Sequence, residues 1–262
     1  MHGLSSAAVP PGPAPLSAIL ITRNEEANIA ECLRSVAFAA ERIVVDSGST
    51  DRTCEIAREL GARVVDAPDW PGFGAQKNRA LDLATQPWVL SIDADERVPA
   101  ALRDEVLAAI ASPRHDAYEI PRRSSYCGQF MAHSGWYPDR VTRLFRRGSA
   151  RFSDDVVHER LIARGSVGRL QSDLLHHSFP DVESVLAKLD RYSTAGAQRM
   201  LQQGKRGSVG RAVASGLWAF VRTYLLQRGF LDGRRGFLLA VSNAEGTYYR
   251  YVKLWLLQQG RR

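Results

Sequence analysis

Two aspartates at the end of an apolar run are the clearest chemical signal in this chain. Residues 88–92 (Trp-Val-Leu-Ser-Ile) lead directly to Asp93 and Asp95, with one alanine between the two acids. An apolar run of this length that ends in acid is typical of a buried parallel strand. Ligands of open α/β sheets bind at the carboxyl ends of such strands, where carboxylates can hold Mg²⁺ or Mn²⁺ against phosphates. The alternative is that Asp93 and Asp95 only open a solvated loop, since acids are common in turns.

Two further acids lie at or just after predicted strand ends. Residues 16–21 and 42–46 have the apolar pattern of strands, and Asp46 ends the second of them. Asp51 begins a predicted helix that stops before Gly61. Asp46, Asp51 and the Asp93/Asp95 pair therefore define one candidate site at a common sheet edge.

The elements that must position these acids alternate between strand and helix from residue 16 to residue 111. A third strand is predicted at 63–66, a helix at 75–84, and another helix after Pro99. This alternation predicts an α/β fold with a mainly parallel central sheet and helices on both faces. From residue 182 onward the pattern is helical.

Charge and cysteine content narrow the classes of partner. The net charge of +7 favours an anionic partner, such as a nucleotide, a phosphorylated glycan, an anionic lipid surface or a nucleic acid. Three scattered cysteines are too few for a disulfide framework or a zinc site. Residues 1–15 are expected to form a flexible leader rather than a secretory signal, and no apolar run is long enough for a transmembrane helix.

Four segments together resemble family 2 glycosyltransferases, which have the GT-A fold. They are Thr-Arg-Asn-Glu at 22–25, Val-Asp-Ser-Gly-Ser-Thr-Asp at 45–51, Gln-Lys-Asn at 76–78 and Asp-Ala-Asp-Glu at 93–96. Residues 157–161 and 176–179, with Lys188 and Tyr192, resemble the β-1,4-glucosyltransferase branch that acts on lipopolysaccharide or lipooligosaccharide cores. The resemblance implies a nucleotide-sugar-binding and catalytic domain over 16–180 and a helical, basic and aromatic extension over 181–262.

The resemblance also implies the residues that bind donor and metal. Asp95 is the expected stronger ligand of a divalent cation, Mg²⁺ or Mn²⁺, with Asp93 and His176 as further candidates. Asp51 could instead stabilise its helix by interacting with the helix dipole at the N-terminus, and Lys77 could be a solvated surface residue. The expected nucleotide-sugar contacts are Thr22, Arg23, Glu25, Asp46, Asp51, Lys77, Asn78 and Asp93.

Transfer with inversion needs one carboxylate as general base on the acceptor side. Glu159, in the Val-His-Glu segment, is the first candidate and Asp155 is the second. Either acid could instead pair with a surface arginine such as Arg151 or Arg160. His158 is a weaker candidate for the site than His176.

Two apolar and aromatic segments near the C-terminus predict contact with a membrane surface. Residues 217–226 and 248–257 have aromatic and aliphatic faces, and arginines flank both. Interfacial helices combine these features, and polybasic clusters attract anionic lipids. The alternative is that both helices pack as ordinary core.

The sequence thus predicts a metal-dependent, inverting hexosyltransferase that moves glucose from UDP-glucose to a lipopolysaccharide core sugar. We expect the protein in the cytoplasm, peripheral at the inner face of the cytoplasmic membrane, with a glycolipid acceptor and no nucleic-acid partner. Three alternatives remain at this stage. The acceptor could be polyprenyl phosphate or another polysaccharide, the chain could bind nucleotide sugars without turnover, or it could be a basic nucleic-acid-binding module.

Overall fold

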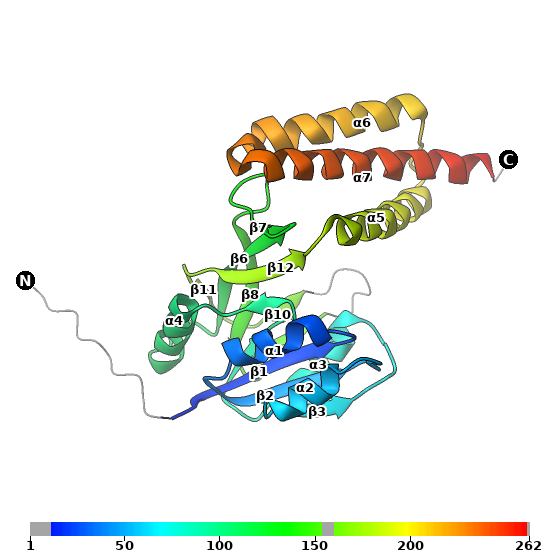
Figure 1. Cartoon of the computed structure of the whole chain (residues 1–262). Helices are drawn as coiled ribbons and strands as arrows, with labels where there is room; N and C mark the ends of the chain where they lie inside the picture. The colour runs from blue at the N-terminus through cyan, green and yellow to red at the C-terminus, as the bar shows by residue number, and fades with distance from the viewer. Residues whose placement is uncertain (1–11, 154–159, 261–262) are drawn as a thin grey trace, which may run out of the picture. The chain divides into compact units, whose positions relative to one another are not determined.

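The computed structural model describes residues 12–153 and 160–260 of the chain, which forms two units (Figure 1). Residues up to 122, together with 140–176, form the first, which we call the sheet unit. Residues 123–139, together with those from 177 onward, form the second, which we call the helical unit. The sequence placed a boundary near residue 180, and the third crossing between the units lies at residues 176/177, but the sequence did not separate residues 123–139.

Four parallel strands form one half of the main sheet, in the order β3 (Arg63–Asp66), β2 (Ala39–Asp46), β1 (Ala14–Thr22) and β4 (Trp88–Ser91). Their carboxyl ends meet at one edge, because Thr22 lies opposite Asp46 and Asp46 lies opposite Asp66 in register. These are the strands that the apolar runs predicted.

The other half of the sheet is mixed. β8 (Asp139–Arg146) pairs antiparallel with β4, and the order continues through β6 (Ala117–Tyr126), β12 (Leu174–Phe179) and β5 (Glu96–Arg97). β5 and β12 are antiparallel, and β11 (Val167–Arg169) runs parallel to β6. β9 (Ala150–Phe152) and β10 (Leu161–Ala163) form a separate antiparallel pair.

Alternating side chains of the parallel strands build a hydrophobic core on each face. On β1, Leu16, Ala18 and Leu20 belong to the core that α1 (Glu26–Ser35), α2 (Thr53–Glu59) and α4 (Ala100–Ala111) cover. Ile19 points to the opposite core, which α3 (Phe73–Asp82) covers. A fully buried leucine or isoleucine side chain contributes about 1.5–3 kcal/mol. The predicted α/β fold of the GT-A type, with helices on both faces, is confirmed.

The helical unit contains α5 (Val182–Gln202), α6 (Val209–Val221) and α7 (Gly233–Gln259), and α6 and α7 lie side by side (Figure 1). A π-helical turn, η1 (Arg222–Leu226), and a 3₁₀ turn, η2 (Gly229–Asp232), join α6 to α7. The short strand β7 (Gln129–Phe130) pairs with the end of β6. The side chains of Asp181 and Ser208 cap α5 and α6 by accepting backbone N–H bonds.

Buried Asp232 fastens the loop after β7 to the helices of the same unit. Its carboxylate accepts the backbone N–H groups of Ala132 and His133 at 3.0 and 3.1 Å and the Ser134 hydroxyl at 2.8 Å. These bonds explain why a segment near residue 130 belongs with the C-terminal helices. No helix within the described ranges has the combination of length and apolarity required to cross a membrane.

Candidate active site

The loops after β1 and β2 are tied to each other by hydrogen bonds. The Asp51 carboxylate accepts the N–H groups of Glu26 and Thr53, at 3.1 and 3.0 Å, at the starts of α1 and α2. The Asn24 side chain accepts the N–H of Thr50 at 2.8 Å. Anionic side chains at helix N-termini are stabilising, and these bonds outweigh burial and lower the pKa of Asp51. We therefore assign Asp51 to joining the two loops at the helix N-termini, which is the alternative that the sequence left open, and its donor contact stays a prediction.

Asp46 organises the turn that follows β2. Its carboxylate is buried and accepts bonds from Thr22 Oγ1 (3.0 Å) and from the N–H groups of Gly48 (2.9 Å) and Ser49 (2.7 Å). Burial by itself would raise its pKa, but the bonds from Ser49 and Thr22 outweigh it and lower the pKa. Gly48 has φ +83°, a conformation that suits glycine in this turn. Asp46 is thus held ionised at the sheet edge.

Asp93 is part of a buried ion cluster. Its carboxylate contacts Lys77 Nζ at 3.1 Å and the Arg143 guanidinium at 2.5 Å. Arg143 also binds Glu96, whose side chain is fully buried, at 2.7 Å. Burial opposes the charge of Asp93, but Arg143 and Lys77 hold the pKa of that carboxyl well below its usual range. Asp93 and Glu96 in turn hold the pKa of Arg143 above its usual range against the effect of burial.

Asp95 has a different partner from Asp93. Its carboxylate lies 3.2 Å from His176 Nε2, and both side chains are partly exposed. Pairing of β12 with β5 places His176 opposite Glu96 in register, which brings the imidazole to this edge. Asp95 and His176 offer one carboxylate and one imidazole, a ligand pair that Mn²⁺ or Mg²⁺ can use.

The three predicted metal ligands do not form one compact set. Among the residues that the structure describes, the His, Cys, Asp or Glu side chains whose ligand atoms form a set within 4.8 Å of one another are Asp46, Cys54 and Asp66. Asp46 already accepts several hydrogen bonds there, and burial raises the pKa of Cys54 to about 11, so neither group suits a cation. Asp93 faces two side-chain cations instead of completing a set with Asp95 and His176.

Three successive buried residues of α3 each hold a different part of the site. Gln76 donates to Ser47 Oγ at 2.9 Å in the turn after β2, and Lys77 reaches Asp93. The Asn78 amide donates to the carbonyl of Phe152 at 2.9 Å and accepts its N–H at 3.0 Å. We therefore assign Asn78 to positioning β9, and its donor contact stays a prediction.

A cavity of about 330 Å³ opens beside the ion cluster within the sheet unit. Its lining includes Lys77, Arg122, Arg143 and Arg160, with Asp93 as the acid among its described residues. Clustered guanidinium and ammonium groups recognise phosphates well. Arg143 and Glu96 were missed as site residues, although an arginine within the apolar run 141–145 was a usable signal.

Acids from three loops share one electrostatic environment. Burial is the main cause of the raised pKa of Glu25. The charges of Asp95, Asp93 and Asp51 raise this pKa further, whereas a hydrogen bond from Asn28 lowers it. Excess negative charge of this kind suits a divalent cation. Arg23 is exposed at the same edge.

The two candidate general bases, Glu159 and Asp155, lie outside the described residues, as does His158.

Comparison with known proteins identifies the family. The family model described as glycosyl transferase family 2 matches residues 17–171, more than half of the chain. The chain belongs to glycosyltransferase family 2. This confirms the resemblance seen in the sequence and makes the protein an enzyme of glycosyl transfer.

Relatives in this family match nearly the whole chain. The lipopolysaccharide core biosynthesis glycosyltransferase LpsC of Rhizobium meliloti (strain 1021) is 33% identical over 251 residues, covering 92% of both chains. An uncharacterised glycosyltransferase of Rickettsia typhi is 32% identical over 252 residues, covering 91% of this chain and 86% of the relative.

Solved structures are more distant. Staphylococcus aureus TarS 1–349 gives a TM-score of 0.48 at 16% identity, covering 94% of this chain and 91% of that chain. Glucosyl-3-phosphoglycerate synthase of Mycobacterium tuberculosis, in complex with Mn²⁺, UDP and glucosyl-3-phosphoglycerate, gives a TM-score of 0.35 at 31% identity. That match covers 43% of this chain and 44% of the synthase.

Proposed function

We propose that this glycosyltransferase moves glucose from UDP-glucose to a sugar of a lipopolysaccharide core, with inversion at the anomeric carbon. The observation that carries the proposal is the arrangement of acids at the ends of β1, β2 and β4 beside a cavity lined by four cations. A nucleotide-sugar donor combines a diphosphate with hydroxyl-rich groups, and this arrangement matches both. The similarity to LpsC over 92% of the chain supports a lipopolysaccharide acceptor.

Asp95 and His176 would hold a divalent cation, Mg²⁺ or Mn²⁺, for the donor. The site fits such an ion because two ligating groups lie 3.2 Å apart among further carboxylates. When bound, the ion would supply Lewis-acid stabilisation of the diphosphate leaving group.

The protein's own cations complete the binding of the donor. Lys77 and Arg143 are fixed by Asp93, so their positions are set before the donor arrives. Arg122 and Arg160 line the same cavity and would bind phosphate oxygens there. Asp46 is our candidate for the contact with the ribose or the base: its ionised carboxylate would exchange one of its present hydrogen bonds for a hydroxyl or N–H of the donor.

The acceptor hydroxyl needs a base, for which Glu159 is our first candidate and Asp155 the second. One carboxylate suffices, because attack opposite the leaving group inverts the anomeric carbon in a single displacement.

We propose that the helical unit contacts an anionic membrane from the cytoplasmic side, where a glycolipid acceptor would lie. Residues 213–238, which we call the exposed apolar segment, contain large side chains that remain in solvent, including Leu217 (65% exposed), Leu226 (63%) and Trp218 (58%). The same segment has four arginines and one aspartate, the buried Asp232. Exposed apolar side chains among arginines suit an interface with anionic lipid.

A transfer assay with several nucleotide sugars tests the proposed reaction. The acceptor is a phosphorylated core oligosaccharide released from lipopolysaccharide, and each reaction runs with Mn²⁺ or with EDTA. We expect UDP-glucose to be consumed fastest, EDTA to stop transfer, added Mn²⁺ to restore it, and the product linkage to be inverted by NMR. Faster transfer from another nucleotide sugar would overturn the donor, and full activity in EDTA would overturn the metal.

A further inference from the structure

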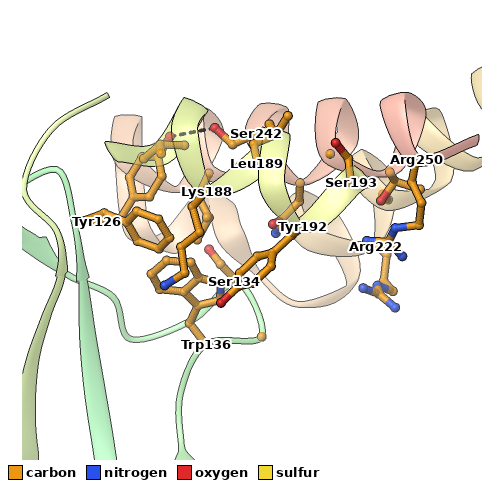
Figure 2. A pocket seen from close by; sticks show the side chains of 18 of the residues that line it. Tyr126, Ser134, Trp136, Lys188, Leu189, Tyr192, Ser193, Arg222, Ser242 and Arg250 are labelled. Carbon is orange, nitrogen blue, oxygen red and sulfur yellow. Dashed lines mark hydrogen bonds between the residues drawn. The ribbon is translucent and has the colours of Figure 1, made fainter. Parts of the chain in front are cut away.

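A second cavity, of about 400 Å³, lies wholly within the helical unit. The end of β6, the loop at 134–136, and the helices α5, α6 and α7 all contribute to its lining. Figure 2 shows that the labelled side chains from these elements converge on a common space. Its volume is in the range of small-molecule sites, about 300–1,000 Å³.

Aromatic rings form one wall of this cavity. The rings of Trp136 and Phe179 have centroids 5.8 Å apart, and Tyr126 packs against both at 6.0 and 6.3 Å. Tyr192 also lines the cavity and remains largely in solvent, at 63% exposure. The C–H groups on one face of a pyranose ring pack well on flat aromatic surfaces of this kind.

Cations line the cavity, and no aspartate or glutamate does so among the described residues. Lys188 lies over the Phe179 ring at 4.5 Å from its centroid, so its ammonium group is held beside the aromatic wall. Arg222 and Arg250 extend toward the same end of the cavity in Figure 2.

These features together define the chemistry of the ligand. Two guanidinium groups that converge can bind the oxygens of one phosphate by several charge-assisted bonds. Ser134, Gln227 and Thr247 add neutral polar groups to the lining, which suit sugar hydroxyls.

We propose that this cavity binds a phosphorylated sugar, with the phosphate at Arg222 and Arg250 and the sugar ring against the aromatic wall. The inference needs no assumption about the donor or the reaction of the sheet unit. A free sugar phosphate and a phosphorylated glycan share this chemistry, and the experiment separates them.

Calorimetric titration of the full chain with glucose 6-phosphate tests the proposal, with glucose and inorganic phosphate as reference ligands. We expect glucose 6-phosphate to bind more tightly than either reference. Arg222→Gln and Arg250→Gln should each weaken binding about tenfold, because each removes charge-assisted bonds to the phosphate. Arg191→Gln, at an exposed arginine of α5 outside the cavity lining, should bind like the unaltered protein.

A second titration uses the phosphorylated core oligosaccharide in place of glucose 6-phosphate. Tighter binding than glucose 6-phosphate, with the same losses in both variants, supports the proposal and assigns the site to a glycan. Equal binding of both probes, again with the losses, supports it and assigns the site to free sugar phosphates. Equal binding of glucose or inorganic phosphate, or unchanged affinity in the folded Arg222→Gln and Arg250→Gln proteins, would overturn the proposal. The titrations measure ligand affinity and the transfer assay measures the reaction. Failure of one is therefore distinguishable from failure of the other.

Discussion

The two units use charged side chains in opposite ways. In the sheet unit, Lys77 and Arg143 are almost fully buried and bind carboxylates at 2.5–3.1 Å. In the helical unit, Arg228, Arg234 and Arg235 are exposed, among apolar side chains that are also exposed. Buried ion clusters fix geometry, whereas exposed cations beside apolar groups are available to an outside surface. The comparison suggests that one unit is built to hold a small charged donor and the other to meet the acceptor and its surroundings.

Removing the central cation should have the largest effect on the sheet unit. Arg143→Met leaves fully buried Glu96 and part-buried Asp93 without their main partner, so the free energy of unfolding should fall by about 3–5 kcal/mol. Urea unfolding followed by circular dichroism measures this loss. Arg146→Met, three residues on in β8 and with a half-exposed side chain, is the matched control and should cost far less. Equal losses in the two variants would mean that the buried cluster contributes no more to the free energy of unfolding than a half-exposed arginine does.

The same cluster makes stability depend on pH in a defined direction. Because the pKa of Asp93 is lower in the folded protein, its ionised carboxylate stabilises the fold fully at pH values above the unfolded pKa of about 3.9. This stabilisation is lost progressively as the pH falls below that value. The gap in unfolding free energy between unaltered protein and Arg143→Met should therefore shrink between pH 7 and pH 3. Denaturant titrations at several pH values measure the gap, and a gap that stays constant would contradict the assigned ion pairs.

Replacing exposed apolar residues should affect the helical unit through membrane binding and leave its folding intact. The double variant Leu225→Ser/Leu226→Ser removes two side chains that are 53% and 63% exposed. Binding to anionic vesicles, measured by sedimentation, should weaken at least about tenfold, from the loss of buried apolar area. Leu186→Ser, at a 51% exposed position of α5, is the control and should bind as before. Equal binding by all three proteins, or binding that does not fall with salt, would refute the membrane contact.

The smallest expected effect concerns Asp51 at the edge of the sheet unit. Asp51→Ala removes the acceptor of two helix N-termini, so the free energy of unfolding should fall by about 1 kcal/mol. The affinity for UDP should stay within a factor of two, since we assign Asp51 to joining loops. Glu55→Ala, on the exposed surface of α2, is the control for a lost surface charge. A large loss of UDP affinity with unchanged stability would instead mean that Asp51 contacts the donor.

The parallel half of the sheet was predictable from sequence because its signals are local. Apolar runs ending at Asp46 and Asp93 mark strands whose carboxyl ends meet in any parallel sheet. The family motifs also lie in short segments, and the family match confirms them.

The rest depends on pairings between distant residues. Arg143 reaches Asp93 across 50 positions of sequence, through pairing of β8 with β4, and no local pattern specifies that register. The bonds between Asn78 and Phe152 likewise join residues 74 positions apart. The sequence therefore could not indicate that this side chain is bonded to β9. Residues 123–139 belong with the helical unit through contacts of the kind that Asp232 makes, about 100 residues away.

Binding of UDP to the full chain, measured by calorimetry with and without Mn²⁺, tests the central claim most directly. The claim is that acids at the strand ends hold a divalent cation that binds the diphosphate of the donor. We predict that Mn²⁺ strengthens UDP binding at least about tenfold in the unaltered protein and in Asp104→Asn, an exposed control, through the added charge of the ion. Asp95→Ala should lose this strengthening. The same strengthening in Asp95→Ala, or none in the unaltered protein, would contradict the account.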